Sequence, residues 1–551
     1  MKKKYLPLII GASMIVGLLI GWGYRVLSDV VALKLYNNRV STDFDPIGYS
    51  QEGQSKVSQI LSILDYCYVD SLNMKALEDS LSSSILSHLD PHSTYLNQEE
   101  VKKETEHFNG QFSGVGMYFM VFEDTIYVTG IMPSTPSARA GLMPGDRIVM
   151  INDTAFTGDS IKSDVVAKTV RGMEGTQIRF KVKRLGYNEL LEFNINREFV
   201  PSSSIEAAVA LNKETGIIAI NSFTKTTYNE FLTKVAELKI LGVKNLIVDL
   251  RDNGGGILNE VVLMANEFLE RDRQILYIEG NKFPRKTFTA DGTGSFKDMK
   301  LAVLINEFSA SASEIFAGAI QDNDRGLVYG RRSFGKGLVQ HSFQLIDGSE
   351  ARVTVARYYI PSGRCIQKPY VKGDNSSYMQ EFFDRFSSGE IFNNDSIKND
   401  TTKIYRTIGG RVVYGGGGIT PDVFVPFDTI PYNKSLNNLY SKGLPSKFIL
   451  RYMMNNINKF FQYSDYKSLE KFIDSEHLDA KFLDFCTEQG YVISPAEKSK
   501  TIEQTMKYFK MQIIHNRFLG DSDEYYKYIF KDDVVVNKAL KGFQTNNDNK
   551  K

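Results

Sequence analysis

Cysteine is scarce in this chain: three residues among 551, far apart in the sequence (Cys67, Cys365 and Cys486). Three isolated thiols cannot form the disulfide framework of a small secreted domain. The sequence contains no C-x-x-C pair and no H-E-x-x-H motif, so it supports neither a zinc-binding module nor a zinc hydrolase. We therefore expect a protein that works without a metal and without an organic cofactor.

Net charge is equally small. The chain has 66 Lys and Arg residues against 65 Asp and Glu residues, which gives +1 at pH 7. A chain so nearly neutral gives no electrostatic reason to expect nucleic acid or a strongly acidic partner. The apolar content of 42% and the charged content of 24% are those of ordinary globular proteins. The length allows several domains.

A long stretch without charge lies at the start of the chain. Lys2, Lys3 and Lys4 precede residues 5–24, which carry no charge and are about long enough to cross a bilayer. The basic start predicts an N-terminus that stays inside and a remainder that lies outside. Neither an A-x-A-like cleavage site nor a cysteine for a lipid anchor follows. We therefore expect an uncleaved, single-pass signal anchor over residues 1–24 in the inner cell membrane, with the folded domains on the extracytoplasmic, periplasmic side.

The segment from 300 to 345 holds the strongest signs of chemistry. Residues 301–305 are a short apolar run typical of a buried strand, and helical periodicity follows from 315 to 321. Between them, Ser311 and Glu314 have the spacing of a capping box, which predicts Ser311 at a helix N-terminus. Unpaired backbone N–H groups and the positive end of the helix dipole would then surround a hydroxyl that could attack a carbonyl and leave an oxyanion.

A base for this hydroxyl is offered by Lys336, which stands between two glycines before a second apolar run. A strand over residues 336–343 would put Lys336, Leu338 and Gln340 on one face. A lysine whose pKa is lowered by burial can accept the Ser311 proton, and Gln340 could orient the amine.

Three plainer interpretations compete with this one. The S-A-S-A-S run could be a helix cap or a flexible turn, and Lys336 could be a solvated turn residue. A phosphate-binding G-x-x-x-x-G-K loop also begins correctly at Gly330, but Gly337 and a strand-like run follow where that loop requires Ser or Thr and a helix. The nucleotide-binding interpretation is excluded on this context.

Two runs, NEFSASASEIFAGAIQDNDR (306–325) and FGKGLVQ (334–340), resemble the carboxyl-terminal processing proteases, also called tail-specific proteases. The resemblance extends over roughly residues 55 to 427. It implies Ser311 as the nucleophile, Lys336 as the base and Gln340 as the residue that supports Lys336, in a ClpP/crotonase-like α/β core.

The resemblance also assigns a role to the RDNGGG turn (251–256), which follows a buried strand over residues 245–250. In this family the turn faces the nucleophile. The N–H groups of Gly255 and Ala312 would then share the oxyanion, with Gly256 as the alternative donor.

Residues 112–200 resemble a PDZ domain. Gly114, Val115, Gly116 and Met117 match the loop whose backbone N–H groups receive a terminal carboxylate, and a helix is expected over residues 160–170. An extended peptide tail could add as a strand in the groove beside that helix. The alternative is a PDZ fold that serves only as a spacer or as a partner-docking unit.

We therefore expect an α+β multidomain chain. Its parts are a signal anchor (1–24), an N-terminal helical region (45–108), a PDZ domain (109–200), a Ser-Lys protease core (201–427), an extra C-terminal helical domain (428–540) and a disordered tail (541–551). Within the core, the polar residues 374–402 predict a loop or an excursion and residues 411–427 a short closing hairpin.

The expected function is that of a serine endopeptidase of the C-terminal processing type. The PDZ domain would capture proteins with accessible C-terminal tails, and the Ser-Lys dyad would cleave these extracytoplasmic proteins near their C-termini. The membrane is the second expected partner, through the anchor; nucleic acid is not one, and assembly into homo-oligomers is left open. The competing interpretation is a non-catalytic PDZ scaffold or adaptor on a protease-like fold.

Overall fold

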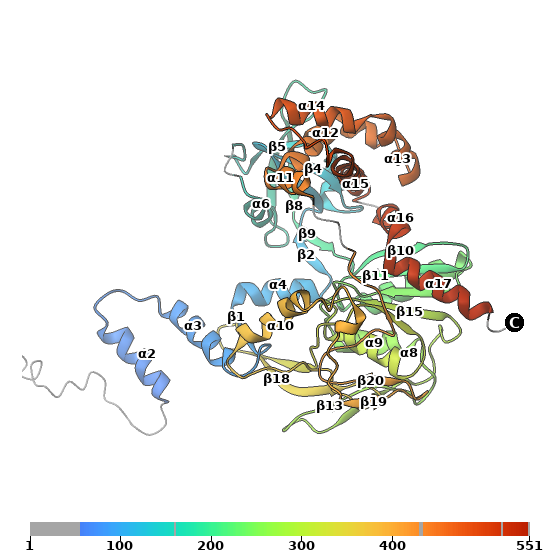
Figure 1. Cartoon of the computed structure of the whole chain (residues 1–551). Helices are drawn as coiled ribbons and strands as arrows, with labels where there is room; N and C mark the ends of the chain where they lie inside the picture. Colours follow the sequence, from blue (N-terminus) through green and yellow to red (C-terminus); the bar gives the residue numbers. More distant parts are fainter. Residues whose placement is uncertain (1–54, 159–160, 429–432, 520–521, 549–551) are drawn as a thin grey trace, which may run out of the picture. The chain divides into compact units, whose positions relative to one another are not determined.

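The computed structural model of the chain describes residues 55–158, 161–428, 433–519 and 522–548 (Figure 1). The chain divides into two units, Met1–Ser82 and Ser83–Lys551. The anchor predicted for residues 1–24 lies outside the described residues. No helix within the described ranges is both long enough and apolar enough to span a bilayer.

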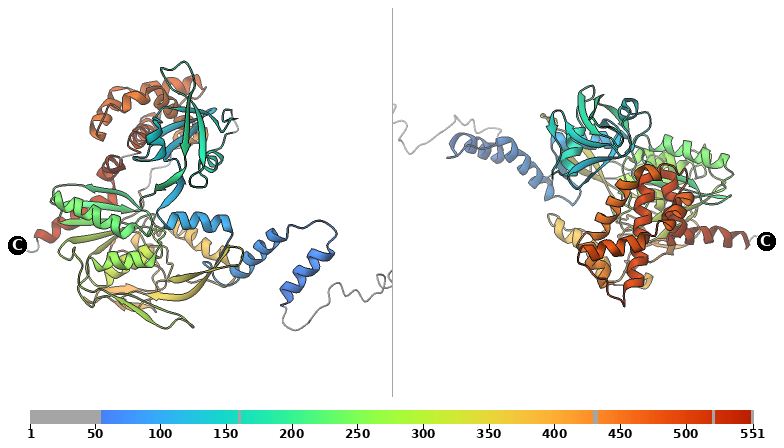
Figure 2. Two further views of the ribbon diagram at one scale, coloured as in Figure 1. Left: turned by 180° about the vertical axis from the view of Figure 1, so that it is seen from behind. Right: turned by 90° about the horizontal axis from the view of Figure 1, so that it is seen from above.

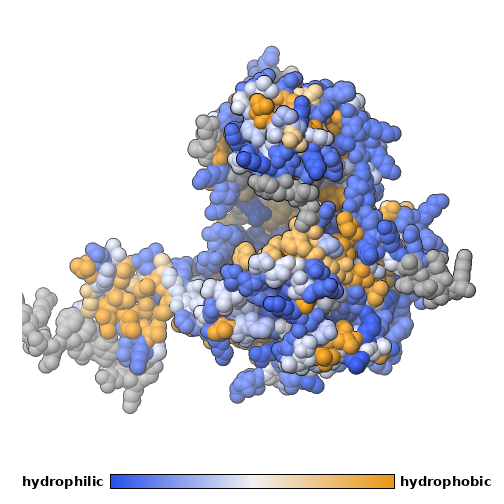
Figure 3. All heavy atoms as spheres, in the orientation of Figure 1, coloured by the Kyte–Doolittle hydropathy of each residue, from blue (hydrophilic) through white to orange (hydrophobic). Residues whose placement is uncertain are grey.

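The first unit contains helix α2 (Lys56–Cys67) and the start of helix α3 (Met74–Ser87). Ser55 caps α2 and accepts a hydrogen bond from the Ser58 N–H at 3.2 Å. Helix α2 has no buried residue, and several of its apolar side chains are exposed (Val57, Ile60 and Ile63). They form an orange surface in Figure 3.

The part expected to be the protease core is built on a six-stranded sheet in the order β10-β11-β12-β15-β16-β21. Strand β10 pairs antiparallel with β11, and the other neighbours are parallel. Parallel strands are covered on both faces, which explains why they read as continuous apolar runs in the sequence. The strands are β10 (Ile205–Ala210), β11 (Thr215–Ile220), β12 (Asn245–Asp249), β15 (Lys300–Ile305), β16 (Leu327–Gly330) and β21 (Val423–Phe424).

Successive residues of these strands bury opposite faces of the sheet. Val248 and Val303 face a core that includes side chains of α7 (Thr227–Ile240), α8 (Leu258–Asn266) and α9 (Ala312–Asp322). The neighbouring residues along each strand, such as Ile247 and Leu304, face a second core that includes α16 (Ser522–Asp532) and α17 (Val534–Asp548). The sheet is therefore sandwiched between two helical layers (Figure 1).

This packing corrects two boundaries. Helices α16 and α17 pack against the protease core sheet, so they do not belong with the helical domain expected up to residue 540. The tail expected to be disordered from residue 541 is helical through Asp548. The physical reason is an apolar stripe on α17 that the sheet covers, with Val536 and Ala539 fully buried and Phe543 nearly so.

A second sheet lies beside the first and carries the predicted base at one end. Its order is β1-β18-β13-β14, with β17 also paired to β18. The strands are β1 (Thr94–Leu96), β13 (Gln274–Glu279), β14 (Lys286–Thr289), β17 (Leu338–Gln344) and β18 (Glu350–Tyr359), and helix α4 (Gln98–Phe108) follows β1.

The expected PDZ domain is a separate sheet in the order β3-β4-β5-β7-β8, with β6 paired to β5, around its own apolar core. Its elements are β3 (Met117–Phe122), β4 (Thr125–Ile131), α5 (Pro136–Ala140), β5 (Arg147–Ile151), β6 (Thr154–Ala155), α6 (Ser163–Val170), β7 (Gln177–Lys183) and β8 (Leu191–Asn196). Strands β2 (Gln111–Gly114) and β9 (Glu198–Pro201) pair antiparallel where the chain enters and leaves this domain.

The C-terminal region contains helices, as the sequence predicts. They gather into one bundle (orange in Figure 2) around buried Phe448, Phe482 and Phe509. They are α11 (Lys434–Ser441), α12 (Leu444–Phe460), α13 (Tyr466–Ser475), α14 (Leu478–Glu488) and α15 (Lys498–Arg517).

The polar segment 374–402 is not the loop that its composition predicts. It contains helix α10 (Asn375–Ser387) and a 3-10 turn, η1 (Asn394–Ser396). Two buried side chains, Tyr378 and Arg385, anchor α10 to the core. The closing hairpin is partly correct: β19 (Ile404–Arg406) and β20 (Val412–Tyr414) form a hairpin, while β21 joins the main sheet.

Candidate active site

The predicted nucleophile and the glycine turn meet at one edge of the main sheet. Strands β12 and β15 are parallel neighbours, and the turn follows β12 as Ser311 follows β15. The carboxyl ends of parallel strands lie at the same edge, which is where α/β proteins build their sites. The contact is close, since a Cβ on Gly255 would lie 2.8 Å from Ser311 Cβ and 2.9 Å from the Ala312 nitrogen. Glycine alone fits this position.

Ser311 stands before the first residue of α9, as the capping-box spacing predicts. Its backbone N–H donates to the Glu314 carboxylate at 2.9 Å. Its φ of 56° and ψ of −114° are unfavourable for any residue other than glycine. Strained backbone of this kind is concentrated at functional sites, where the surrounding contacts hold it in place.

The hydroxyl groups of the two neighbouring serines already donate hydrogen bonds to backbone carbonyls. Ser309 Oγ donates to the Leu250 carbonyl at 2.7 Å, and Ser313 Oγ donates to the Asn253 carbonyl at 2.9 Å. Both side chains are fully buried. Ser311 is half-buried and lines a cavity, so it is the hydroxyl of the S-A-S-A-S run that a substrate can reach.

Lys336 lines the same cavity as Ser311. Burial lowers the pKa of the Lys336 amine, and the nearby Arg352 guanidinium lowers it further. The carboxylates of Glu314, Asp90 and Glu104 act in the opposite direction and raise the pKa without reversing the shift. A lysine with a lowered pKa is neutral at a lower pH than an ordinary one, and only the neutral amine can accept a proton.

Gln340 also lines the cavity, but its hydrogen bond differs from the expected one. Its Nε2 donates to Thr354 Oγ1 at 3.2 Å, and among the described contacts it has no hydrogen bond with the Lys336 amine. Lys336 precedes β17 instead of lying in it, and the β17–β18 register shifts between Val339 and Gln340. The simple alternation assumed for a strand over residues 336–343 is therefore broken.

The two predicted oxyanion donors are not equally free to bind an oxyanion. Ala312 is the first residue of α9, where an N–H group has no partner within the helix. The Gly255 N–H already donates to Asn253 Oδ1 at 2.8 Å, and that bond would have to open for Gly255 to serve an oxyanion. Gly254 and Gly256 line the same cavity, and neither N–H has a hydrogen bond to the described part of the chain. The N–H group of Gly256, the alternative donor, could therefore bind an oxyanion without first losing a hydrogen bond, unlike that of Gly255.

Sequence reasoning gave Glu314 only a capping role, yet it joins the two halves of the site. Its fully buried carboxylate accepts from the Ser311 N–H (2.9 Å), the Gly335 N–H (2.7 Å), the Lys336 N–H (2.9 Å) and Ser333 Oγ (2.5 Å). Burial raises the pKa of Glu314 to about 7, against these hydrogen bonds, which lower it. The capping-box spacing signals one of the four bonds; the other three cross 19 to 22 residues of sequence.

The turn formed by residues 90–93, with the sequence D-P-H-S, contributes His92 to the cavity wall. Asp90 accepts from the N–H groups of His92 and Ser93 and from Thr354 Oγ1, which ties this turn to β18. His92 Nε2 lies 2.9 Å from the Tyr378 hydroxyl. Burial lowers the pKa of His92 to about 4, with a further contribution from Lys336. These contacts give the segment a structural role, and the imidazole is neutral at physiological pH.

The cavity itself measures about 730 Å³, large enough for several residues of an extended peptide. Its wall combines polar and charged side chains, such as Glu104 and Arg352, with apolar ones. The apolar lining comes from Val101, Phe108, Ile257, Leu258, Ile315, Leu338, Val339 and Tyr358.

The predicted carboxylate loop lies in the PDZ domain. Gly114 is the last residue of β2, Met117 is the first residue of β3, and Val115 and Gly116 connect them. The carbonyls of Val115 and Gly116 accept from the N–H groups of Ser137 (2.8 Å) and Met132 (3.1 Å). Strand β3 is the edge strand of its sheet, as strand addition by a peptide requires.

Comparison with known families and proteins agrees with these features. Residues 214–377 match Peptidase family S41, and residues 127–184 match the PDZ domain family. A "Probable CtpA-like serine protease" of Staphylococcus aureus (strain COL) is 33% identical over 350 residues, which cover 63% of this chain and 68% of that protein. Its namesake in Staphylococcus haemolyticus (strain JCSC1435) is 31% identical over 373 residues, covering 63% and 74%.

Coverage of these relatives is incomplete. For the Staphylococcus aureus (strain MRSA252) protein of the same description, which is 34% identical, the chain spans 64% of the relative's length. Among solved structures, a photosystem II D1 C-terminal processing protease is 24% identical, with 68% of this chain and 87% of that one covered and a TM-score of 0.35. The sequence relatives and the family matches establish that the chain belongs to peptidase family S41.

Proposed function

We propose that the chain is a serine endopeptidase that uses Ser311 as its nucleophile and Lys336 as its base. The observation that carries this proposal is the shared cavity: a strained serine and a half-buried lysine with a lowered pKa line it together, and one carboxylate, Glu314, binds the backbone of both. Nucleophile and base held in register by a third group is the arrangement that covalent catalysis requires.

The reaction would run in two stages. Neutral Lys336 takes the hydroxyl proton as Ser311 Oγ attacks the scissile carbonyl, and the Lys336 ammonium then gives that proton to the leaving amine. Water, deprotonated by the same lysine, hydrolyses the acyl-enzyme and regenerates Ser311. The tetrahedral oxyanion would be held by the Ala312 N–H and by a glycine N–H of the turn. Removing one such donor costs about 2.7–4 kcal/mol of transition-state stabilisation.

Substrate choice would come from the PDZ domain. A free C-terminal tail would add to the edge of β3 and place its carboxylate at Gly114, Val115, Gly116 and Met117. The cavity around Ser311 has room for an extended segment near the cleaved bond, and Ile257, Leu258 and Ile315 offer apolar contacts to its side chains. The substrates would therefore be proteins with accessible C-terminal tails.

Localisation to the inner membrane is part of the proposal. It is supported by the uncharged residues 5–24 behind three lysines, and it places the folded domains on the extracytoplasmic side. A protease added to cells whose outer layers are permeabilised and whose inner membrane is intact should then degrade the protein. Protection from the protease would contradict this placement.

A non-catalytic scaffold would account for the PDZ domain but gives the active-site cavity no role. Burying a lysine beside an arginine disfavours its charged form, and a scaffold gains nothing from that cost.

The deciding experiment is turnover of an unfolded protein with an apolar C-terminal tail. The wild-type chain should cleave it, and Ser311→Ala should lose turnover while it keeps its fold and its binding to the tail. Ser475→Ala, an exposed serine on α13, serves as the control and should cleave at the wild-type rate. Cleavage by Ser311→Ala would remove this serine from its role.

A further inference from the structure

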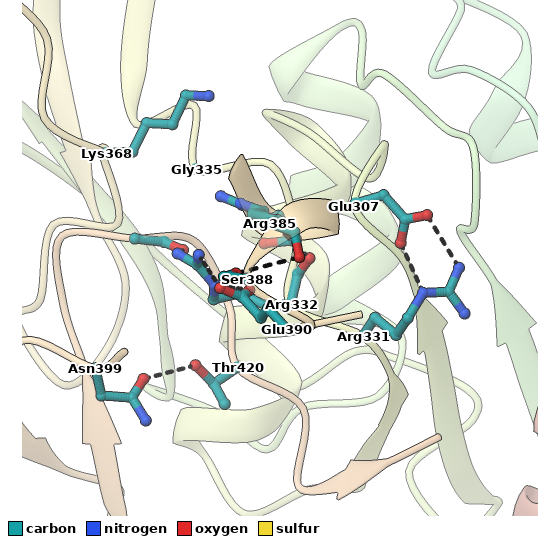
Figure 4. A network of polar contacts seen from close by, with 12 residues as sticks. Glu307, Arg331, Arg332, Gly335, Lys368, Arg385, Ser388, Glu390, Asn399 and Thr420 are labelled. Carbon is teal, nitrogen blue, oxygen red and sulfur yellow. Dashed lines mark hydrogen bonds and ion pairs between the residues drawn. The ribbon is translucent and has the colours of Figure 1, made fainter. Parts of the chain in front are cut away.

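Arg385, on helix α10, is buried against the loop that carries Lys336. The Arg385 side chain is only 3% exposed. Its guanidinium donates to the Ser333 carbonyl at 2.8 Å and to the Phe334 carbonyl at 3.2 Å, with a longer contact to the Arg332 carbonyl at 3.4 Å. Figure 4 shows Arg385 close to Gly335 and Arg332.

The same loop is held from its other side by Glu314. Arg385 donates hydrogen bonds to carbonyl groups of the loop, whereas Glu314 accepts hydrogen bonds from the N–H groups of Gly335 and Lys336 and from the Ser333 hydroxyl. The Gly335 carbonyl is also occupied, by the Lys368 N–H at 2.9 Å. The backbone immediately before the base is therefore bound on both its donor and acceptor sides, by groups from three separate segments.

The charge of Arg385 is compensated, so it can stay buried. Its Nε donates to Glu381 at 2.9 Å, and Glu381 also accepts from Lys368 Nζ at 2.9 Å. The adjacent Arg332 is paired with Glu390 at 2.6 and 2.7 Å (Figure 4). A buried charge that is paired and hydrogen-bonded in this way can be stable where an isolated one cannot.

We propose that Arg385 is a positioning residue for the base: it fixes the carbonyl groups of residues 333 and 334 so that the Lys336 amine is held at the nucleophile. This inference rests on the proposed Ser311–Lys336 mechanism. The planar fork of an arginine can span two carbonyls, which a lysine ammonium at the same place cannot do with the same geometry. Small displacements of a catalytic group cost up to about a hundredfold in rate, so the fork matters for turnover.

The test compares Arg385→Met with a matched control, Arg325→Met. Arg325 is a half-buried arginine that also donates to backbone carbonyls, those of Phe268 (2.8 Å) and Lys297 (2.8 Å), which lie outside the loop that carries Lys336. Both variants should lose thermal stability. Arg385→Met should lower kcat between about tenfold and a hundredfold with little change in KM, whereas Arg325→Met should keep the wild-type kcat.

A second measurement reads the loop directly. Hydrogen exchange is followed on Ser311→Ala with and without Arg385→Met, so that turnover plays no part. The amides of residues 333–337 should exchange faster when Arg385 is absent, and those of the PDZ domain should not change. If Arg385→Met does not fold, Arg385→Lys replaces it; this variant keeps the charge and should still lose at least about threefold in kcat.

Two failures are distinguishable. If Arg385→Met, or Arg385→Lys in its place, keeps the wild-type kcat or leaves exchange at 333–337 unchanged while Ser311→Ala is inactive, the positioning role is wrong and the Ser-Lys mechanism stands. If Ser311→Ala or Lys336→Ala keeps turnover, the proposed function itself fails.

Discussion

At the scale of single residues, the sequence identifies the groups better than their contacts. Ser311 and Lys336 line one cavity, as their motifs imply, and the pKa of Lys336 is lowered by burial as a base requires. Gln340 and Gly255 line the same cavity. Each donates a hydrogen bond to a partner that was not expected: Gln340 to Thr354, and the Gly255 N–H to Asn253. Spacing predicts that a residue is near a site, but the partner of an amide group depends on every other donor and acceptor around it.

The lowered pKa of Lys336 leads to a pH prediction. As the proposed base, Lys336 would act only when its amine is neutral, so activity should rise with pH through the pKa of Lys336 and fall as acid protonates it. Because Arg352 contributes to lowering that pKa, Arg352→Gln should raise the pKa and move the acid limb of the kcat profile to higher pH.

The measurement is kcat from pH 5 to 10 for the wild type, Arg352→Gln and a control, Lys244→Gln. Lys244 forms an exposed ion pair with Glu214, so its replacement should not move the profile. Glu314, with a pKa of about 7, titrates in the same range, which is why the comparison between variants and not the shape of one curve carries the argument. An acid limb that stays in place in Arg352→Gln would contradict the role of Lys336 as a neutral base.

At the scale of elements, strongly periodic segments were predicted correctly and polar ones were not. The buried strands β12 and β15 and helix α9 are confirmed near their expected bounds. Helix α10 was expected to be a loop, because its polar composition hides the two side chains that anchor it. Helix α17 was expected to end in disorder, because its apolar stripe is short and the strands that it contacts, β12, β15 and β16, lie far earlier in the sequence.

The contact between the last helices and the sheet predicts a large effect of one substitution. Phe530 on α16 is 3% exposed within the second core, so Phe530→Ala should cost about 3–5 kcal/mol of the free energy of unfolding. Phe199→Ala on β9, where the side chain is 45% exposed, should cost much less. Urea unfolding of the full chain, followed by a probe in the protease core, measures the difference. Equal losses in the two variants would show that α16 does not pack on the sheet.

At the scale of the whole molecule, the chain is not a row of independent domains. The PDZ domain is inserted between two strands that pair with each other, β2 and β9, so its ends are held together. The protease core is completed by the end of the chain: Arg251, in the glycine turn region, forms an ion pair with Asp533 at 2.7 Å. The PDZ domain is therefore joined to the rest of the chain through two paired strands.

This organisation predicts that a substrate is recognised by its free end. A peptide with a C-terminal amide should bind Ser311→Ala about tenfold or more weakly than the same peptide with a free carboxylate, since hydrogen bonds to a charged group contribute about 1.5–3 kcal/mol. Fluorescence anisotropy with the two labelled peptides measures this. Equal affinity would mean that the loop of residues 114–117 does not receive a carboxylate.

The sequence by itself determined the chemistry-bearing groups and the elements that carry them: the capped serine, the lysine between glycines, the glycine turn and the PDZ segment. These features depend on residues a few positions apart, where backbone geometry is local. Tertiary structure alone decided that Glu314 joins the nucleophile to the base, that Arg385 grips the Lys336 loop, and that α17 covers the sheet. Each of these is a contact between distant segments, formed because a buried polar group needs a partner or an apolar stripe needs a surface, and no local pattern specifies which partner that will be.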